Sequence, residues 1–357
     1  MGKLRVGIVG VGNISKTYIR NLSELDTTAV IACSDIDDMR ARQVADDNGI
    51  PHALQVDELL GSDEIDLVLN LTIPSAHHEV AKRALLQGKH VYNEKPLSVE
   101  RNQGEELIRI AAERKVILGC APDTFLGAGL QTCRRIIDSG AIGTPIGFNA
   151  FMLGRGPENW HPSPDFFYKR GGGPLFDMGP YYLTAIIALL GPIESISALA
   201  RASFSQREIT QGALAGKRID VEIPTHHIAA LQLKSGVIGQ LQTSFDVWAA
   251  KVPFIEIYGS EGTISCPDPN TFDGPVLVRL ANMMEWEERS LAYQPPVNGR
   301  GLGIHDISES LTQGRLPRAS GALAFHVLDA MHSILESSET GSRVRLTSFV
   351  NQPSPMV

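Results

Sequence analysis

The stretch LRVGIVGVGNIS at residues 4–15 decides the fold of the first part of the chain. Residues 4–9 form an apolar run typical of a strand buried on both faces, and a glycine-rich turn and a helical pattern follow it. Gly10 and Gly12 permit a tight turn and let backbone N–H groups approach a pyrophosphate at the start of the helix, where the helix dipole favours an anion. Ser15 stands at the third position of the fingerprint instead of glycine, and it is small enough for close packing of helix on strand. Because glycine-rich turns follow many strands, this motif alone also fits an ordinary turn.

Apolar runs and helical patterns continue to alternate up to about residue 120. The strand-like runs are Val30–Cys33, Asp66–Leu71, His90–Tyr92 and Val116–Cys120, and the helical patterns are Ile14–Leu25, Asp37–Asn48, Ala76–Gln87 and Val99–Glu113. Parallel strands cannot be joined by hairpins, so this alternation predicts a doubly wound parallel sheet of the Rossmann type. We expect this dinucleotide-binding domain to cover residues 1–122.

The remainder of the chain has a different pattern. One helix is expected at Gly127–Asp138, and alternating runs predict strands at Ile146–Met152, Ile193–Arg201, His226–Lys234, Val237–Phe245, Phe254–Tyr258 and Val276–Leu280. The short turn at Lys234–Gly236 is typical of a hairpin, and Ser205–Asp220 is expected to be a mobile loop. Strands without crossover helices indicate a mainly antiparallel sheet. We therefore predict an α+β domain over residues 123–357 that binds substrate and forms a homodimer or homotetramer through its open sheet.

Composition excludes several classes of function. The chain has 357 residues, 43% of them hydrophobic and 20% charged, which suits two globular domains. A net charge of −8 and the lack of Lys/Arg runs argue against nucleic-acid binding. The longest apolar stretch, Leu183–Leu190, is far shorter than the roughly 20 residues that span a bilayer. Because a strand pattern begins at Leu4, we expect no secretory leader. Four single cysteines indicate a reducing, cytoplasmic location.

Asp35 ends the second predicted strand, 25 residues after Gly10, where a carboxylate can accept hydrogen bonds from both ribose hydroxyls of a dinucleotide. A carboxylate there repels a 2′-phosphate, so the sequence predicts NAD rather than NADP. Arg40, on the following helix, is the residue that would turn toward a 2′-phosphate. On a helical face it can equally be a solvated side chain.

Two later clusters carry residues suited to catalysis. Glu94-Lys95-Pro96 follows the apolar run His90–Tyr92, at the carboxyl edge of the sheet where ligands bind in open α/β folds, and a lysine there can polarise a substrate hydroxyl. The second cluster is GGGPLFDMGPY at residues 171–181, in which Asp177 and Tyr181 would share one face of a helix. In a dehydrogenase, a carboxylate can orient a substrate hydroxyl and a neighbouring phenol can transfer its proton, so this pair suits that class of enzyme. Taken singly, the clusters also fit a surface lysine, a capping aspartate and a core tyrosine.

Together these motifs resemble the Gfo/Idh/MocA oxidoreductase family (glucose–fructose oxidoreductase, inositol dehydrogenase and relatives). The motifs occur along the chain in the family's order, and a Leu-Thr-Ile-Pro loop at residues 71–74 lies between the glycine-rich turn and Glu94-Lys95-Pro96. The likeness covers nearly the whole chain. The resemblance implies hydride transfer between a nicotinamide and a carbinol carbon of a monosaccharide, cyclitol or other polyol. It implies that Lys95 contacts cofactor and substrate and that Asp177 positions the substrate. The cofactor contacts it implies are Gly10, Gly12, Asn13, Ile14, Asp35, Arg40, Thr72, Pro74, His77, Glu94 and Lys95.

The chain departs from the family's pattern at one place. Many relatives carry histidine four residues after the aspartate and a second aspartate three residues further on, where this chain has Tyr181 and Thr184. Tyrosine at this position resembles glucose–fructose oxidoreductase and dihydrodiol dehydrogenase. A free phenol, with a pKa of about 10, is a weak base at neutral pH. Tyr181 would therefore need the positive charge of Lys95 or of the cofactor to act as the base.

Two other segments are candidates for substrate contact. Trp160 offers an aromatic face to a sugar ring and His161 a hydrogen bond or a proton relay, although a packing tryptophan and an exposed histidine fit the pattern equally. Asp123 and Phe125, directly after the predicted strand Val116–Cys120, are expected to face the same cleft. His226-His227 point to opposite sides of a strand, so no metal site is predicted.

Three functions remain open from the sequence. The first is an NAD-dependent dehydrogenase that acts on a monosaccharide or an inositol-like polyol. The second is a sugar–sugar oxidoreductase with a tightly bound cofactor, which Tyr181 favours. The third is a non-catalytic sensor of sugar or NAD, which the presence of Lys95 and Asp177 disfavours.

Overall fold

The computed structural model describes residues 2–356, which form two compact units. The first unit runs up to Gly127 and includes Gln294–Leu328, and the second is Ala128–Tyr293 with the residues from Asp329 on. This division differs from the expected boundary at residue 122, because the segment 294–328 returns to the first unit. The Cys120 N–H donates to the Ala319 carbonyl at 3.1 Å, so the returning chain covers the edge strand of the Rossmann sheet.

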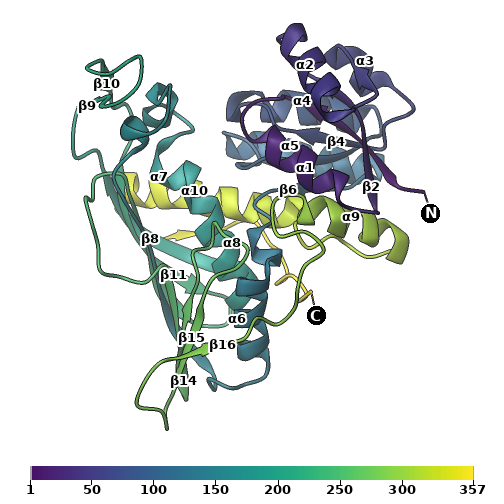
Figure 1. Cartoon of the computed structure of the whole chain (residues 1–357). Coiled ribbons are helices and arrows are strands. Elements are labelled where there is room, and N and C mark those ends of the chain that lie inside the picture. Colours follow the sequence, from purple (N-terminus) through teal and green to yellow (C-terminus); the bar gives the residue numbers. More distant parts are fainter. Residues whose placement is uncertain (1, 357) are drawn as a thin grey trace. The chain divides into compact units, whose positions relative to one another are not determined.

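The first unit is built on a six-stranded sheet in the order β3-β2-β1-β4-β5-β6, and every pairing is parallel (Figure 1). Its strands are β1 Leu4–Val9, β2 Thr28–Ser34, β3 His52–Ala53, β4 Leu67–Asn70, β5 His90–Asn93 and β6 Leu118–Cys120. The predicted doubly wound sheet is thus confirmed. The order reverses between β1 and β4, which creates the switch point where ligands bind in such sheets.

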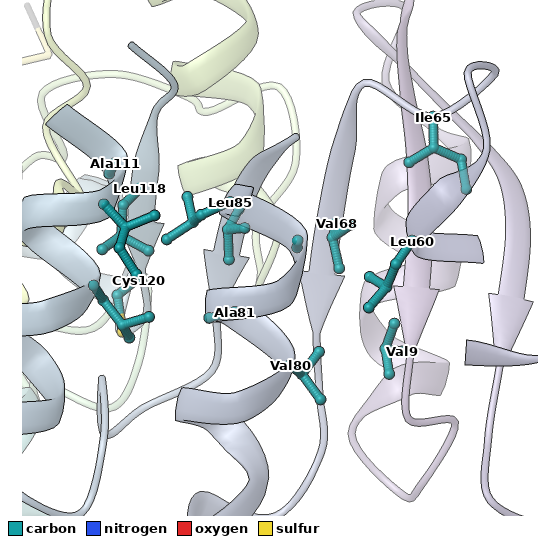
Figure 2. Close-up of a cluster of buried hydrophobic side chains, with 14 of the residues drawn as sticks. Val9, Leu60, Ile65, Val68, Val80, Ala81, Leu85, Ala111, Leu118 and Cys120 are labelled. Carbon is teal, nitrogen blue, oxygen red and sulfur yellow. The ribbon is translucent and has the colours of Figure 1, made fainter. Parts of the chain in front are cut away.

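Helices cover this sheet and bury its apolar faces. They are α1 Ser15–Ser23, α2 Asp38–Asn48, α3 Val56–Gly61, α4 Pro74–Leu86, α5 Arg101–Arg114 and α9 Leu302–Gln313. Figure 2 shows part of the core, where side chains of β1, β4 and β6 pack against those of α3, α4 and α5, for example Val9, Val68, Val80 and Leu118. The two-residue strand β3 and the six-residue helix α3 were not predicted, because such short segments show no clear period.

A nine-stranded sheet dominates the second unit, in the order β16-β15-β14-β13-β7-β12-β11-β8-β17 (Figure 1). The strands are β7 Pro145–Leu153, β8 Ile193–Arg201, β11 His226–Leu233, β12 Ile238–Ser244, β13 Ile255–Gly259, β14 Gly262–Cys266, β15 Val276–Leu280, β16 Glu287–Arg289 and β17 Val344–Arg345. Only β7 and β12 pair in parallel among the described strands of this sheet, so the mainly antiparallel prediction is confirmed. The hairpin at Lys234–Gly236 is also confirmed, since β11 and β12 pair on either side of it.

Helices pack on one face of this second sheet and leave its other face open. They are α6 Ala128–Asp138, α7 Gly173–Asp177, α8 Gly179–Leu190 and α10 Gly321–Thr340, of which α10 contributes to both units. Two short strands, β9 Gln206–Glu208 and β10 Arg218–Asp220, pair outside the large sheet. Within residues 2–356 no helix is long and apolar enough to cross a membrane.

Candidate active site

The turn between β1 and α1 has the geometry of a phosphate-binding loop. Gly10 has a φ of +93°, and a Cβ there would lie 2.8 Å from the Leu71 carbonyl, so only glycine fits. A Cβ on Gly12 would meet no heavy atom within 4 Å, so its backbone is open to an approaching ligand. The buried Ser15 hydroxyl donates to the Gly12 carbonyl at 2.7 Å and fixes the turn, and no side chain caps the α1 N-terminus at Ile14. The open backbone and this helix end together can receive an anion.

A cavity of about 330 Å³ lies beside this turn in the first unit, and Gly10, Gly12, Asp35 and Arg40 are among its lining residues. Ile36, with 98% of its surface exposed, and Ile73, with 68%, also line it. These two side chains give the cavity an apolar wall. The cavity therefore combines an anion cradle with an apolar slot.

Asp35 is held in place by the same turn. Its Oδ2 accepts from the Val11 N–H at 2.9 Å and its Oδ1 from the Asp37 N–H at 3.0 Å. Its side chain is 9% exposed, and Arg40 Nη2 lies 3.9 Å from Oδ1. Each carboxylate oxygen can accept more than one hydrogen bond, so both remain able to bind hydroxyl groups.

A buried pair of asparagines ties the loops that follow β4 and β5. Asn70 Nδ2 donates to Asn93 Oδ1 at 3.0 Å, while Asn70 Oδ1 accepts from the Thr72 hydroxyl at 2.7 Å. Asn93 Nδ2 donates to the Leu97 carbonyl at 3.2 Å, and both amides are fully buried. These bonds hold the Thr72 loop beside the loop that carries Lys95, and neither asparagine was predicted to act at the site.

Glu94 fixes the backbone of Lys95. Its Oε1 accepts from the Tyr18 hydroxyl at 2.9 Å, and its Oε2 accepts from the Lys95 N–H at 2.8 Å. Arg300, from the returning segment, has its Nε 3.9 Å from the same carboxylate. Burial raises the pKa of the Tyr18 phenol well above its ordinary value, so it remains a donor to Glu94. The Lys95 side chain itself is partly exposed at the carboxyl edge of the sheet.

In the second unit, Asp177 and Tyr181 lie on two successive helices. The prediction of one continuous helix is wrong: α7 ends at Asp177, Met178 links the two, and α8 begins at Gly179 with Pro180 in its first turn. Proline has no N–H to continue the α7 hydrogen-bond ladder, which explains the break. The Tyr181 N–H instead donates to the Met178 carbonyl at 3.0 Å.

Trp160 and His161 lie between two 3₁₀ turns, Pro157–Asn159 and Asp165–Tyr168. The Trp160 side chain is 65% exposed, and its ring meets His161 edge-on at 5.5 Å between centroids. The Ser163 N–H donates to His161 Nδ1 at 3.1 Å, so a neutral ring carries its proton on Nε2. This loop therefore presents an indole and a hydrogen-bond donor.

Comparison with known proteins matches both units to one family. The family model described as an oxidoreductase family with an NAD-binding Rossmann fold matches residues 4–121, and the one described as the GFO/IDH/MocA C-terminal domain matches residues 130–265. The chain belongs to the Gfo/Idh/MocA oxidoreductase family. The resemblance inferred from the sequence motifs is confirmed, and so is a nicotinamide-binding Rossmann domain.

Several known proteins are similar to this chain over most of its length. It is 26% identical to a 1,5-anhydro-D-fructose reductase of Ensifer adhaerens over 73% of this chain and 74% of the relative. It is 25% identical to a myo-inositol 2-dehydrogenase of Thermotoga maritima, again over 73% of this chain and 74% of the relative. A levoglucosan dehydrogenase solved with NADH has the same fold, with a TM-score of 0.82 at 17% identity over 97% of this chain and all of that one.

Two of the cofactor contacts implied by the Gfo/Idh/MocA resemblance have a different role here. His77 is 1% exposed, and its Nδ1 and Nε2 lie 2.7 Å and 2.9 Å from the Pro96 and Thr72 carbonyls. Burial lowers the pKa of this imidazole, against the effect of the two carbonyl contacts. Glu94 likewise points inward to Tyr18. Both side chains hold the loops of the site in place, so we assign neither to the cofactor.

The expectation that Asp123 and Phe125 face a substrate is also wrong for this structure, because both side chains are buried, at 1% and 2% exposure. Asp123 Oδ2 accepts from the Gly301 and Gly303 N–H groups at 2.9 Å and 3.0 Å, where it caps the start of α9. Burial raises the pKa of this carboxyl, and the two N–H donors oppose the rise. No metal site is assigned: within residues 2–356, no group of three His, Cys, Asp or Glu side chains is arranged to bind an ion.

Proposed function

We propose that this chain is an NAD-dependent dehydrogenase that oxidises or reduces a carbinol carbon of a monosaccharide, a cyclitol or a related polyol. The observation that carries the proposal is the open turn at Gly12 beside a cavity that contains Asp35, at the same sheet edge as Lys95. The names of the anhydrofructose reductase and the inositol dehydrogenase support the substrate class.

The first unit supplies the cofactor contacts in this proposal. The backbone from Gly10 through Asn13 and Ile14 binds the pyrophosphate, and Asp35 binds the ribose hydroxyls. Ile36 and Ile73 enclose the adenine ring with apolar surface, and Thr72 and Pro74 line the path toward the nicotinamide. When bound there, the nicotinamide would supply or accept the hydride at the carbinol carbon. The Asp35 carboxylate favours NAD over NADP, and Arg40 is the group that would accept a 2′-phosphate instead.

The substrate roles follow from side-chain chemistry. The Lys95 ammonium polarises the reacting hydroxyl, the Asp177 carboxylate holds a hydroxyl of the substrate, and the Tyr181 phenol transfers the proton. Trp160 covers one face of the ring, and His161 donates a hydrogen bond from Nε2. Tyr181 also supports a second candidate, a sugar–sugar oxidoreductase, which would be purified with its cofactor still bound.

The test is NADH formation, followed by absorbance, across a panel of sugars, sugar acids and inositols with NAD and NADP in parallel. We expect at least one member of the panel to be oxidised with reduction of NAD to NADH. If NAD binds by calorimetry but no compound reduces it, the dehydrogenase proposal fails. Cofactor retained through purification would then favour the sugar–sugar oxidoreductase.

Replacement of Asp35 by asparagine tests the choice of cofactor. We expect the KM for NAD to rise roughly 10-fold or more, because a hydrogen bond to a charged group contributes about 1.5–3 kcal/mol. The ratio of NADP to NAD activity should rise as well, since the charge that repels a 2′-phosphate is gone. Asp37→Asn is the matched control, because Asp37 bonds Arg40 on the exposed side of the turn. An unchanged KM for NAD in Asp35→Asn would show that the carboxylate does not bind the ribose.

The open face of the second sheet supports a homodimer or homotetramer. Three large aliphatic side chains there are 44–73% exposed, namely Leu199, Ile228 and Ile238. Leu199 and Ile228 are directly paired across β8 and β11, and a cavity of about 470 Å³ opens on the same sheet. We expect the protein to sediment as a dimer or tetramer and Leu199→Glu to sediment with a lower mass. Met284→Glu, at another exposed position, should keep the wild-type mass. A monomeric wild type would refute the interface.

A further inference from the structure

A buried ionic cluster contacts the loop of residues 157–168 in the second unit, called the Trp160 loop below. Arg207, on β9, has a side chain only 2% exposed, and its Nε donates to Glu158 Oε1 at 2.9 Å. Its Nη1 donates to Asp246 Oδ1 at 2.7 Å, and Nη1 and Nη2 both donate to the Phe245 carbonyl, at 3.2 Å and 3.1 Å. One guanidinium thus joins β9, the end of β12 and the Trp160 loop.

Glu158 connects this cluster to the two aromatic residues of the loop. It lies two positions before Trp160, and its carboxylate also accepts from the Tyr168 hydroxyl. Its own carbonyl accepts from the Thr210 N–H at 3.1 Å, so backbone and side chain are both fixed. The Trp160 and His161 N–H groups donate to the carbonyl of Pro157, the residue before Glu158, at 3.2 Å and 2.9 Å. A displacement of Glu158 would therefore also displace Trp160 and His161.

A small apolar core joins the same segments. Phe167 and Tyr168 of the loop pack with Ile209 and Ile219, which belong to the β9–β10 region, and with Phe245, which directly follows β12. This core is built from residues on separate parts of the chain and lies apart from the main sheet core. It can hold the loop near β9, but apolar contacts do not fix the direction of a ring as hydrogen bonds do.

The buried charges are not explained by stability alone. Burying Arg207 with two carboxylates carries a large desolvation cost, and apolar residues of similar volume often give equal or greater stability. A planar guanidinium with donors in fixed directions does, however, hold several acceptors in one arrangement. The hydrogen bonds of Arg207 can therefore hold the Trp160 loop in one arrangement relative to β9 and the residues after β12.

We propose that Arg207 is a positioning residue for the substrate. Through Glu158 it holds the loop so that Trp160 and His161 stand where they bind the sugar, and this sets the affinity for the sugar. The inference rests on the proposed function, in which these two side chains contact the substrate. The groups proposed to carry the chemistry, Lys95, Asp177 and Tyr181, are outside the cluster.

Arg207→Lys tests this role, because lysine keeps the charge and loses the fork of donors. We expect the KM for the sugar to rise roughly tenfold, kcat to stay within about threefold and the KM for NAD to stay unchanged. Arg318→Lys is the matched control, since Arg318 pairs with the fully buried Asp306 in the first unit. It should leave the KM for the sugar unchanged. Glu158→Gln, which keeps the size of the side chain and loses its charge, should raise the same KM if Arg207→Lys does not fold.

A second readout does not depend on turnover. The chain has three tryptophans, and replacing Trp248 and Trp286 by phenylalanine leaves Trp160 as the single tryptophan, whose emission can be excited selectively at wavelengths where tyrosine does not absorb. In this background we expect Arg207→Lys to change the quenching of Trp160 fluorescence by acrylamide. We also expect the sugar concentration that half-saturates the Trp160 fluorescence change to rise by the same factor as the KM for the sugar. If Arg207→Lys is active and its KM for the sugar is unchanged, the inference is overturned. It is also overturned if kcat falls as much as the affinity for the sugar. If the wild type turns over no sugar, the proposed function fails instead, and the acrylamide result still shows whether Arg207 holds the loop.

Discussion

Lys95→Ala should lower kcat about 10³-fold and leave the affinity for NAD nearly unchanged. A positioned acid–base or electrostatic group typically contributes a factor of 10² to 10⁴. The pyrophosphate turn and Asp35 are on other loops, so the residues that hold most of the cofactor remain. The Glu94 carboxylate accepts a hydrogen bond from the backbone N–H of residue 95. Alanine retains this N–H, so the loop should keep its conformation.

The two effects are separated by measuring turnover in the NADH assay and NAD binding by calorimetry on the same preparation. Lys82→Ala is the control, because Lys82 is a surface lysine on α4 paired with Glu106. Turnover within about tenfold of the wild type would refute the role assigned to Lys95. A loss of NAD binding as large as the loss of turnover would assign Lys95 to the cofactor alone.

Gly10→Ala should abolish measurable NAD binding and lower the melting temperature. The left-handed backbone costs a residue with a Cβ about 1–2 kcal/mol, and here the Cβ would also lie 2.8 Å from backbone atoms of Leu71. Because both the turn and the Leu71 backbone are rigid parts of the site, one of them has to move. Either movement distorts the cradle for the pyrophosphate.

Gly12→Ala provides a contrast at the neighbouring glycine. A Cβ at Gly12 meets nothing within 4 Å, so the melting temperature should stay near that of the wild type while the affinity for NAD falls. Gly61→Ala, at another open position with no ligand role, should change neither quantity. Tight NAD binding by Gly12→Ala would mean that the pyrophosphate does not approach this backbone, and the cofactor placement would be wrong.

The Rossmann half of the fold was predictable because its signal is local. Each buried strand is a short apolar run, each helix has its own period, and the turn at Gly10 directly follows β1. The nine-stranded sheet was predictable in type but not in order, since strands such as β8 and β17 pair across more than a hundred residues. Ser205–Asp220, expected to be a mobile loop, forms the β9–β10 pair, because its few apolar residues show too short an alternation to predict strands.

Several roles at the candidate site could not be predicted from the sequence, because they depend on contacts between distant parts of the chain. Asp123 ends buried because its partners, the N–H groups near Gly301, come from a segment 178 residues away. His77 and Glu94 carry groups that suit a cofactor, and only the structure shows that their hydrogen bonds go to the protein. Arg207 has no motif around it at all. The preference for NAD, the oligomer, the absence of a metal and the cytoplasmic location remain predictions.

The most direct test of hydride transfer uses a sugar or polyol from the active part of the panel, deuterated at the carbinol carbon that is oxidised. We expect the deuterium on C4 of the nicotinamide in the NADH formed, and a slower turnover than with the unlabelled compound. Oxidation of the labelled compound with no deuterium on the nicotinamide would contradict hydride transfer between sugar and cofactor in this protein.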